Sequence, residues 1–242
     1  MSKWLEARVL ENRHWTDALF SLRVEASRLP FEPGQFVRIG IEPGLVRPFS
    51  FVNPPEDPVL EFYGIVVPEG PLSPRLARLK AGDRMVVATN PAGFLVLREV
   101  PDADTLWLVS TGTGIAPFLS ILRTETPWRR FRNVVLVHAV RHAHELTYQA
   151  MIGEIQKDHP LRYVTFVSRE PHAGSLAGRI PAAIRDGGLE AAAAGAKLDE
   201  RCHVMLCGNP EMLRDATSAL VERGLRKHRR RTPGHITVES FW

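Results

Sequence analysis

The stretch Thr105-Leu106-Trp107-Leu108-Val109-Ser110-Thr111-Gly112-Thr113-Gly114-Ile115-Ala116-Pro117 decides how the second half of this chain folds. Its beginning, Thr105–Val109, is a short and nearly continuous apolar run, which is typical of a buried strand. Gly112 and Gly114 then permit a tight turn and a close approach of the backbone to a ligand. Because a Gly-rich turn at a helix start presents backbone N–H groups, the stretch predicts a phosphate-binding turn. It departs from the Gly-x-Gly-x-x-Gly fingerprint, so a standard Rossmann dinucleotide site is not expected.

Residues 104–242 alternate between strand-like runs and helical patterns. The expected strands are Thr105–Val109, Asn133–His138, Leu161–Val167, His203–Cys207 and His235–Glu239. The expected helices are Pro117–Thr124, Glu145–Lys157, Ile180–Ala194 and Pro210–Arg223. Apolar strands that alternate with helices predict a parallel sheet covered on both faces.

Residues 4–97 have a different pattern, with short alternating runs rich in β-branched and aromatic residues. The expected strands are Ala7–Asn12, Ala18–Val24, Gln35–Ile41, Phe49–Val52, Leu60–Val66 and Arg84–Ala88. Strands at this spacing predict a small antiparallel barrel or sandwich. One helix is expected at Pro74–Lys80, with Ser73 as its N-cap. The boundary falls near Leu97–Asp104, which gives an N-terminal β domain at 1–99 and a C-terminal α/β domain at 100–242.

Composition is that of an ordinary water-soluble globular protein, with 44% apolar and 24% charged residues in 242. No apolar run approaches the ~18 residues of a membrane span, and no secretory signal is visible. Cys202 and Cys207 are too few for an iron–sulfur centre, and their spacing argues against a disulfide, so a reducing, cytoplasmic location is expected. The net charge of +4 is partly concentrated in Arg226–Arg231. This segment is either a solvated loop or a docking patch for an acidic partner, and nucleic acid is disfavoured because no aromatic residues accompany it.

A second motif, Arg47-Pro48-Phe49-Ser50, has the parts to hold a flavin. It offers a cation for a phosphate, a flat ring to pack on a flat ring, and a small hydroxyl for a ring nitrogen. Phe49 alone is equally well explained as a core ring on a strand, but its two neighbours favour the flavin. The order of this segment and the Gly-rich turn indicates a two-domain flavoprotein reductase.

Over essentially its full length the chain resembles the bacterial ferredoxin/flavodoxin–NADP(H) reductase family, and its aromatic end resembles the enterobacterial-type branch. The segments that carry the resemblance are His14–Leu22, Pro33–Phe36, Arg47–Ser50, Leu72–Leu76, Thr111–Pro117, Val167–Glu170, Gly178–Pro181, Cys207–Met212 and Phe241-Trp242. The resemblance implies an N-terminal antiparallel β-barrel that binds FAD and a C-terminal parallel-sheet α/β domain that binds NADP(H). Hydride would pass between NADP(H) and flavin N5, and single electrons between the flavin and an acidic ferredoxin or flavodoxin.

The resemblance also implies the residues that line FAD. They are Arg47, Pro48, Phe49, Ser50, Tyr63, Gly64, Ile65, Pro71, Leu72, Ser73, Thr113, Phe241 and Trp242. Arg47 would hold the pyrophosphate, Phe49 would lie against the ring system, and Ser50 would approach N5. Ser73 would serve the cofactor, its own helix, or both. Tyr63–Ile65 are also explained by a plain strand, and the last two aromatic residues by a tail packed on the core.

For NADP(H) the family pattern implies Val140, Arg141, Ser168, Arg169, Arg179, Cys207, Gly208 and Asn209. Arginines near strand ends favour NADP over NAD, because cations hold the 2′-phosphate where NAD sites place a carboxylate. Glu170 is close enough in sequence to pair with one of these arginines instead.

The expected catalytic residues are Ser50, Cys207 and Glu239, and no metal is expected. Cys207 is either near the nicotinamide or simply a buried small residue. Glu239 is either a proton relay or a strand-end carboxylate. The alternative functions are an NADPH-dependent flavin or quinone reductase (a diaphorase) and a non-catalytic flavin- or nucleotide-sensing module. A monomer is expected.

Overall fold

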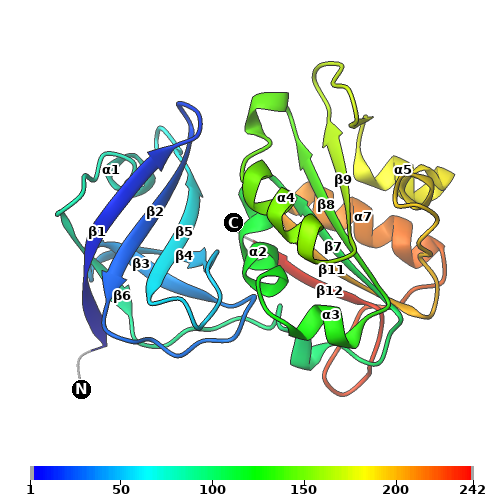
Figure 1. The fold of residues 1–242 in the computed structure, drawn as a ribbon, viewed down its shortest axis with the longest axis horizontal. Helices are drawn as coiled ribbons and strands as arrows, with labels where there is room; N and C mark the ends of the chain where they lie inside the picture. The colour runs from blue at the N-terminus through cyan, green and yellow to red at the C-terminus, as the bar shows by residue number, and fades with distance from the viewer. Residues whose placement is uncertain (1–2, 241–242) are drawn as a thin grey trace. The chain divides into compact units, whose positions relative to one another are not determined.

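The computed structural model describes residues 3–240. Its contacts divide the chain into two units. One unit comprises the chain up to Val96 together with Ala116–Thr124, and the other comprises Leu97–Ile115 and the chain from Glu125 onward. Each unit contains one six-stranded sheet (Figure 1). The prediction of an antiparallel sheet followed by a parallel α/β sheet is confirmed.

The first sheet is antiparallel, with strand order β4-β3-β6-β1-β2-β5. The strands are β1 (Trp4–His14), β2 (Leu19–Ala26), β3 (Phe36–Glu42), β4 (Leu45–Ser50), β5 (Val59–Ile65) and β6 (Arg84–Ala88). A bridge between Phe51 and Phe62 links the chain just after β4 to β5, at the other edge of the sheet. Alternate residues such as Phe20, Leu22, Ile39 and Phe62 point into one core because side chains on a strand alternate between faces.

The strand expected at Phe49–Val52 begins earlier, at Leu45, so Arg47 and Pro48 lie inside it. Proline usually argues against a strand because it lacks a backbone N–H. Here β4 is an edge strand that pairs with β3 alone, so one side of it needs no ladder donor. This explains how a proline is accommodated between the arginine and the phenylalanine.

The helix expected at Pro74–Lys80 is wrong in both extent and cap. The observed helix α1 (Ser73–Leu76) has four residues, its N-cap is Leu72, and no side chain caps it. Ser73 is the first helical residue, and its Oγ accepts a hydrogen bond of 2.8 Å from the Val67 N–H. Leu72 is buried in the core. Burial of Leu72 and Leu76 therefore fixes this turn, and capping does not.

The second sheet is parallel, with strand order β10-β9-β8-β7-β11-β12. Its strands are β7 (Thr105–Thr111), β8 (Asn133–Val140), β9 (Leu161–Val167), β10 (Leu176–Ala177), β11 (Cys202–Gly208) and β12 (Ile236–Ser240). The helices are α2 (Ala116–Leu122), α3 (Thr126–Arg130), α4 (Gln149–Asp158), α5 (Ile180–Asp186), α6 (Gly188–Ala192) and α7 (Pro210–Glu222), with 3-10 turns η1 (Leu97–Glu99), η2 (Gly112–Ile115) and η3 (Ala143–Glu145). Figure 1 shows α4 on one face of this sheet and α5 and α7 on the other. The face toward α5 and α7 carries a continuous core that includes Trp107, Val137 and Leu206.

Two of the helices differ from the sequence prediction because single residues adopt left-handed backbone conformations. Gly187 has φ +80° and divides the helix expected at Ile180–Ala194 into α5 and α6. Tyr148 has φ +59°, so α4 begins at Gln149 and not at Glu145. A left-handed residue cannot continue a right-handed helix. The short elements α3 and β10 were not predicted.

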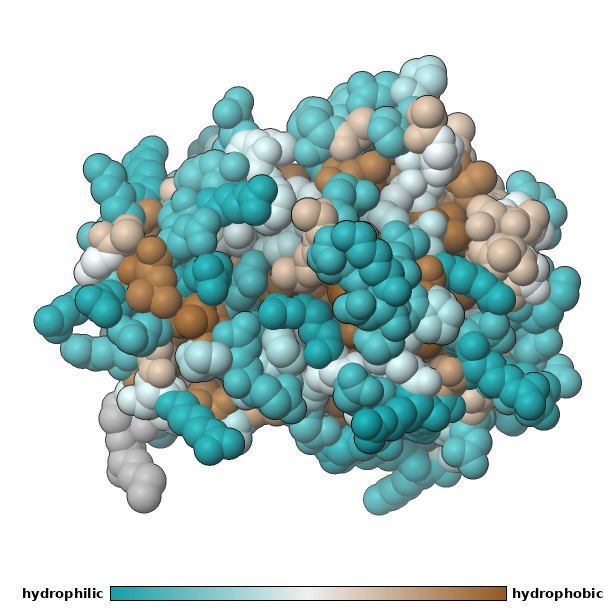
Figure 2. All heavy atoms as spheres, viewed as in Figure 1, coloured by the Kyte–Doolittle hydropathy of each residue, from teal (hydrophilic) through white to brown (hydrophobic). Residues whose placement is uncertain are grey.

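The surface is mainly hydrophilic on the face shown in Figure 2. Among the described residues, the exposed large apolar side chains are Leu10, Val67, Phe94, Val221 and Val238, which are far apart in the sequence. None of the helices within residues 3–240 has the length and apolarity needed to cross a lipid bilayer.

Candidate functional site

The end of β4 carries an exposed guanidinium, an aromatic ring and a buried hydroxyl. Arg47 is exposed, and its Nη1 donates to the carbonyl of Val46 at 2.8 Å; no carboxylate in residues 3–240 pairs with it. Ser50 is 2% exposed, and its Oγ has no hydrogen-bond partner in the described part of the chain. A buried hydroxyl without a partner costs about 1–3 kcal/mol. This residue therefore fits a site in which a ligand supplies the missing partner, as the flavin hypothesis requires.

Phe49 is half-buried and lies over Gly64 of β5. A Cβ at position 64 would lie 2.7 Å from Cε1 of Phe49 and 3.0 Å from Cζ of Phe20. Gly64 is therefore required by packing within the protein itself, whatever binds there. Phe49 packs against the core yet keeps part of its ring exposed, so both roles that the sequence left open are compatible with its position.

The other residues expected to bind FAD differ in their exposure and in which of their groups are available to a ligand. Tyr63 is buried on the face of β5 opposite to the core residue Phe62, whereas Ile65 is half-buried and Pro71 is exposed. Leu72 is committed to the core and the Ser73 hydroxyl to Val67, so mainly their backbone groups remain for a ligand. Phe241 and Trp242 lie outside the described residues.

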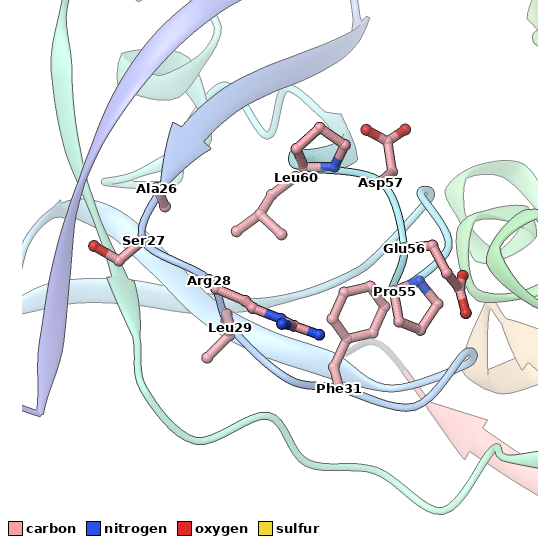
Figure 3. Close-up of a pocket in the computed structure, with 10 residues that line it drawn as sticks. Ala26, Ser27, Arg28, Leu29, Phe31, Pro55, Glu56, Asp57 and Leu60 are labelled. Atoms are coloured by element: carbon pink, nitrogen blue, oxygen red, sulfur yellow. The ribbon is translucent and has the colours of Figure 1, made fainter.

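A separate open cavity of about 290 Å³ lies in the first unit (Figure 3). Its lining residues are Ala26, Ser27, Arg28, Leu29, Phe31, Pro55, Glu56, Asp57, Pro58 and Leu60. It sits where β2 ends and β5 begins, whereas Gly64 and Ile65 pair with the start of β2. Asp57 is already paired with Arg123 at 3.3 Å. None of the residues expected to hold FAD lines this cavity.

In the second unit, three expected NADP residues follow the aligned ends of three neighbouring strands. Val140 pairs with Val167, and Val167 pairs with Ala177. Arg141 comes one residue after this level on β8, and Arg169 and Arg179 come two residues after it on β9 and β10. Carboxyl ends of parallel strands are where open α/β sheets bind ligands. The strand register therefore gathers three cations at one edge.

These three arginines are exposed, and their side chains form no hydrogen bond or ion pair with the described residues. Most other arginines in the unit are paired, for example Arg185 with Glu222 at 2.7 Å and Arg201 with Asp104 at 2.5 Å. The cations at the sheet edge are therefore free to meet an anion.

The nearby carboxylates are occupied by backbone groups rather than by the arginines. Glu170 accepts from the Ala143 N–H at 2.6 Å and lies 3.7 Å from Nδ1 of His142. The Ala143 N–H and, secondarily, His142 hold the pKa of Glu170 below its usual range. Glu145 accepts from the backbone N–H groups of Arg141 and His142. The pairing of Glu170 with an arginine that the sequence left open is not formed. The Ser168 Oγ–H donates to the carbonyl of Val140. Val140 is buried.

The Gly-rich turn and the end of β11 fit together with no space for a Cβ atom. A Cβ on Gly114 would lie 2.6 Å from the Cys207 carbonyl oxygen, and one on Gly208 would lie 2.2 Å from Oγ1 of Thr111. Thr111 Oγ1 also accepts from the Asn209 N–H at 2.9 Å. The Asn209 Oδ1 caps α7 by accepting from the N–H groups of Glu211 and Met212, so this oxygen is engaged within the protein. Thr113 is half-exposed on η2.

Cys207 and Glu239 are register partners in β11 and β12. Cys207 is fully buried, and burial, followed by the nearby charge of Glu239, raises the pKa of its thiol. The thiol is therefore protonated and is no nucleophile. Both cysteines of the chain are free and buried.

The register reveals polar residues that the sequence analysis did not single out. Cys207 pairs with Ser110, Ser110 with His138, and His138 with Thr165. Together with Glu239 these residues form a polar row across five strands, on the face opposite to the α5–α7 core. A sequence signal existed for His138, which is the one polar residue within the apolar run 134–140 of β8.

Comparisons with known proteins agree with this arrangement. A family model described as an oxidoreductase NAD-binding domain matches residues 108–218. The chain is 51% identical over 248 residues to a flavodoxin/ferredoxin–NADP reductase of Shigella flexneri and 50% identical to that of Escherichia coli strain K12, with 100% of both chains covered in each case. The structure of a ferredoxin NADP+ reductase from Neisseria gonorrhoeae with bound FAD and NADP superposes with a TM-score of 0.95 at 31% identity, over 100% of both chains.

Proposed function

This chain belongs to the flavodoxin/ferredoxin–NADP reductase family, and we propose that it exchanges a hydride with NADP(H) and single electrons with an acidic ferredoxin or flavodoxin. It is an oxidoreductase that uses FAD and NADP(H). Bound FAD supplies the redox chemistry, because it exchanges two electrons with NADP(H) as a hydride and one electron at a time with a carrier. Residues 1–99 are assigned to FAD and residues 100–242 to NADP(H).

The observation that carries the proposal is the Ser50 hydroxyl, which is buried and has no partner in the described chain. On the same strand, Arg47 offers a guanidinium that pairs with no carboxylate of the described chain, which suits a pyrophosphate. In this proposal Ser50 donates to a ring nitrogen, Phe49 supports the ring system, and Arg47 binds the pyrophosphate. Gly64 leaves room for the Phe49 ring.

In the second unit, Arg141, Arg169 and Arg179 hold the 2′-phosphate, and this role is supported by the lack of side-chain partners for them among the described residues. Cys207 is neutral and fully buried, so it contributes shape and excludes water without forming a covalent bond. Glu239, its register neighbour, is half-buried and is the candidate to hold or move a proton.

The protein is further proposed to work as a monomer in the cytoplasm. Two free, buried cysteines are consistent with a reducing compartment. The basic segment Arg226–Arg231 remains a candidate docking surface, although Arg230 is paired with Glu99 at 2.8 Å.

The test is a visible spectrum of the purified protein, followed by anaerobic addition of NADPH and, separately, NADH. A yellow protein that NADPH bleaches quickly and NADH slowly is the expected result. A colourless protein that takes up no FAD would contradict the proposal. Electron transfer to ferredoxin or flavodoxin should weaken as salt increases, because charged interfaces are screened. Rapid transfer to free flavin or quinone with no transfer to either carrier would instead identify a diaphorase.

A further inference from the structure

A buried histidine contacts the carbonyl group at the start of the Gly-rich turn. His138 of β8 is 0% exposed, and its Nε2 lies 3.1 Å from the carbonyl oxygen of Gly112. A carbonyl oxygen only accepts hydrogen bonds, so Nε2 must carry the proton. Nδ1 is then an acceptor.

The other ring nitrogen has a donor on the next strand. The Tyr163 hydroxyl lies 3.5 Å from Nδ1 of His138, which is a long hydrogen bond. The same hydroxyl oxygen accepts from Nε2 of Gln149, the first residue of α4, at 2.8 Å. The donors thus run in the order Gln149, Tyr163 and His138 toward Gly112, and the Gln149 amide also donates to the carbonyl of Thr147 at 3.4 Å. Burial also lowers the pKa of His138 to about 4, so the ring stays neutral near pH 7 and keeps Nδ1 as an acceptor.

The Gly112 carbonyl determines where the next amide points. In a trans peptide the C=O of Gly112 and the N–H of Thr113 point in opposite directions. Because the carbonyl points at the buried imidazole, the Thr113 N–H points away from the interior. The first N–H groups of a helical turn also lack an acceptor within the turn, which leaves them for a ligand.

Because residue 112 is a glycine, the orientation of the Gly112–Thr113 peptide is only weakly fixed by the backbone itself. Gly112 has φ +52°, and a Cβ there would meet nothing within 4 Å. Glycine accepts many backbone conformations, so sterics alone do not prevent the peptide between Gly112 and Thr113 from rotating. Gly112 is also the first residue of the 3-10 turn η2, and the hydrogen bond from His138 is the side-chain contact that opposes this rotation.

We propose that His138, oriented by Tyr163 and Gln149, is a positioning residue that holds the Gly112–Thr113 peptide in the orientation in which the Gly-rich turn receives NADP(H). The inference rests on the proposed function, since it concerns the same nucleotide site. It assigns a role to His138, Tyr163 and Gln149, which are not among the residues expected to bind either cofactor.

Two substitutions separate the two ring nitrogens. In His138→Gln the amide nitrogen occupies roughly the place of Nε2 and still donates to Gly112. In His138→Asn the shorter side chain reaches roughly the place of Nδ1, so the bond to Gly112 is lost. Tyr163→Phe removes only the hydroxyl that selects the tautomer.

The first readout is independent of activity. ¹⁵N NMR of the wild-type holoenzyme should show His138 protonated at Nε2 and not at Nδ1 from pH 6 to 8. Amide exchange of Thr113 should become faster in His138→Asn and stay near wild type in His138→Gln. An Nδ1-protonated ring, or equal exchange in the two variants, would overturn the inference.

The second readout is flavin reduction at saturating NADPH in stopped flow, beside the affinity for 2′,5′-ADP, which contains the 2′-phosphate but no nicotinamide. His138→Asn should reduce the rate about tenfold, the effect of losing about 1.4 kcal/mol. His138→Gln should stay within about twofold, Tyr163→Phe should lie between, and 2′,5′-ADP affinity should not change. A purely structural histidine would give equal losses in the Asn and Gln variants. If NADPH fails to reduce the wild-type flavin, the proposed function fails, while tautomer and amide exchange still decide this inference.

Discussion

The arginine cluster at the edge of the second sheet gives the sharpest test of nucleotide choice. Arg169 and Arg179 follow aligned strand ends and are exposed without side-chain partners in the described chain. Replacing both with Ala breaks no side-chain hydrogen bond or ion pair within residues 3–240, so the fold should keep its stability within about 0.5 kcal/mol. Their whole effect should therefore appear in nucleotide binding.

The expected magnitude follows from the exposure of these side chains. A hydrogen bond to a charged group contributes about 1.5–3 kcal/mol, and solvent screening at an exposed site favours the lower end. Each substitution should thus raise the KM for NADPH about tenfold. The double variant should raise it by about 30- to 100-fold, because two side chains on one phosphate are not fully additive. The KM for NADH, which has no 2′-phosphate, should change less than about threefold.

The assay is steady-state ferricyanide reduction with each nucleotide, at low and high salt. Arg185→Ala is the matched control, because Arg185 is an exposed arginine of the same unit that is bound at two points to Glu222. It should leave both KM values unchanged. Equal losses for NADPH and NADH in the double variant would refute the 2′-phosphate role, and so would an effect of similar size in the control.

Three further predictions concern packing and protonation. Ser50→Ala removes a buried hydroxyl that has no partner within residues 3–240, so the FAD-free protein should unfold at the same or a higher temperature, while flavin reduction by NADPH should slow at least tenfold. A clear loss of stability would contradict this. Gly64→Ala should destabilise by about 1–3 kcal/mol in urea unfolding through overpacking, whereas Gly44→Ala, with nothing within 4 Å of its Cβ, should be nearly neutral. Burial lowers the pKa of His138 to about 4 and that of His203 to about 3, so below pH 6.5 these histidines bind protons in the unfolded chain before they do so in the folded protein. The free energy of unfolding should therefore fall by about 2 kcal/mol per histidine between pH 7 and pH 5. A free energy of unfolding that stays constant over this range would contradict the prediction.

The two sheets and their order were predictable because each has its own hydrophobic period. The continuous apolar runs of β7 and β11 indicate strands buried on both faces, and the alternating runs of β2 and β5 indicate one buried face. The arginines of the expected 2′-phosphate site were also accessible from sequence, because an arginine directly after an apolar strand lies at a carboxyl edge.

What could not be predicted depends on single backbone conformations and on register. Nothing in the sequence identifies Tyr148 as left-handed, and Ser73 has the residue type of an N-cap although Val67 takes its hydroxyl. The contact of His138 with Gly112 requires β7 and β8 to be aligned residue by residue, which a one-dimensional pattern does not specify.

Because α2 belongs to the first unit, the order in which the chain is synthesised affects when that unit can fold. All seven residues of α2 are buried, the Ser120 hydroxyl donates to the carbonyl of Asn53, and Arg123 pairs with Asp57. During synthesis, the first unit therefore lacks part of its packing until residues 116–124 have left the ribosome, well after its last strand, β6. A fragment that ends near residue 99 lacks the same segment. The first unit thus completes its packing only after part of the second unit has been made, and a stalled chain would expose the surface that α2 later covers.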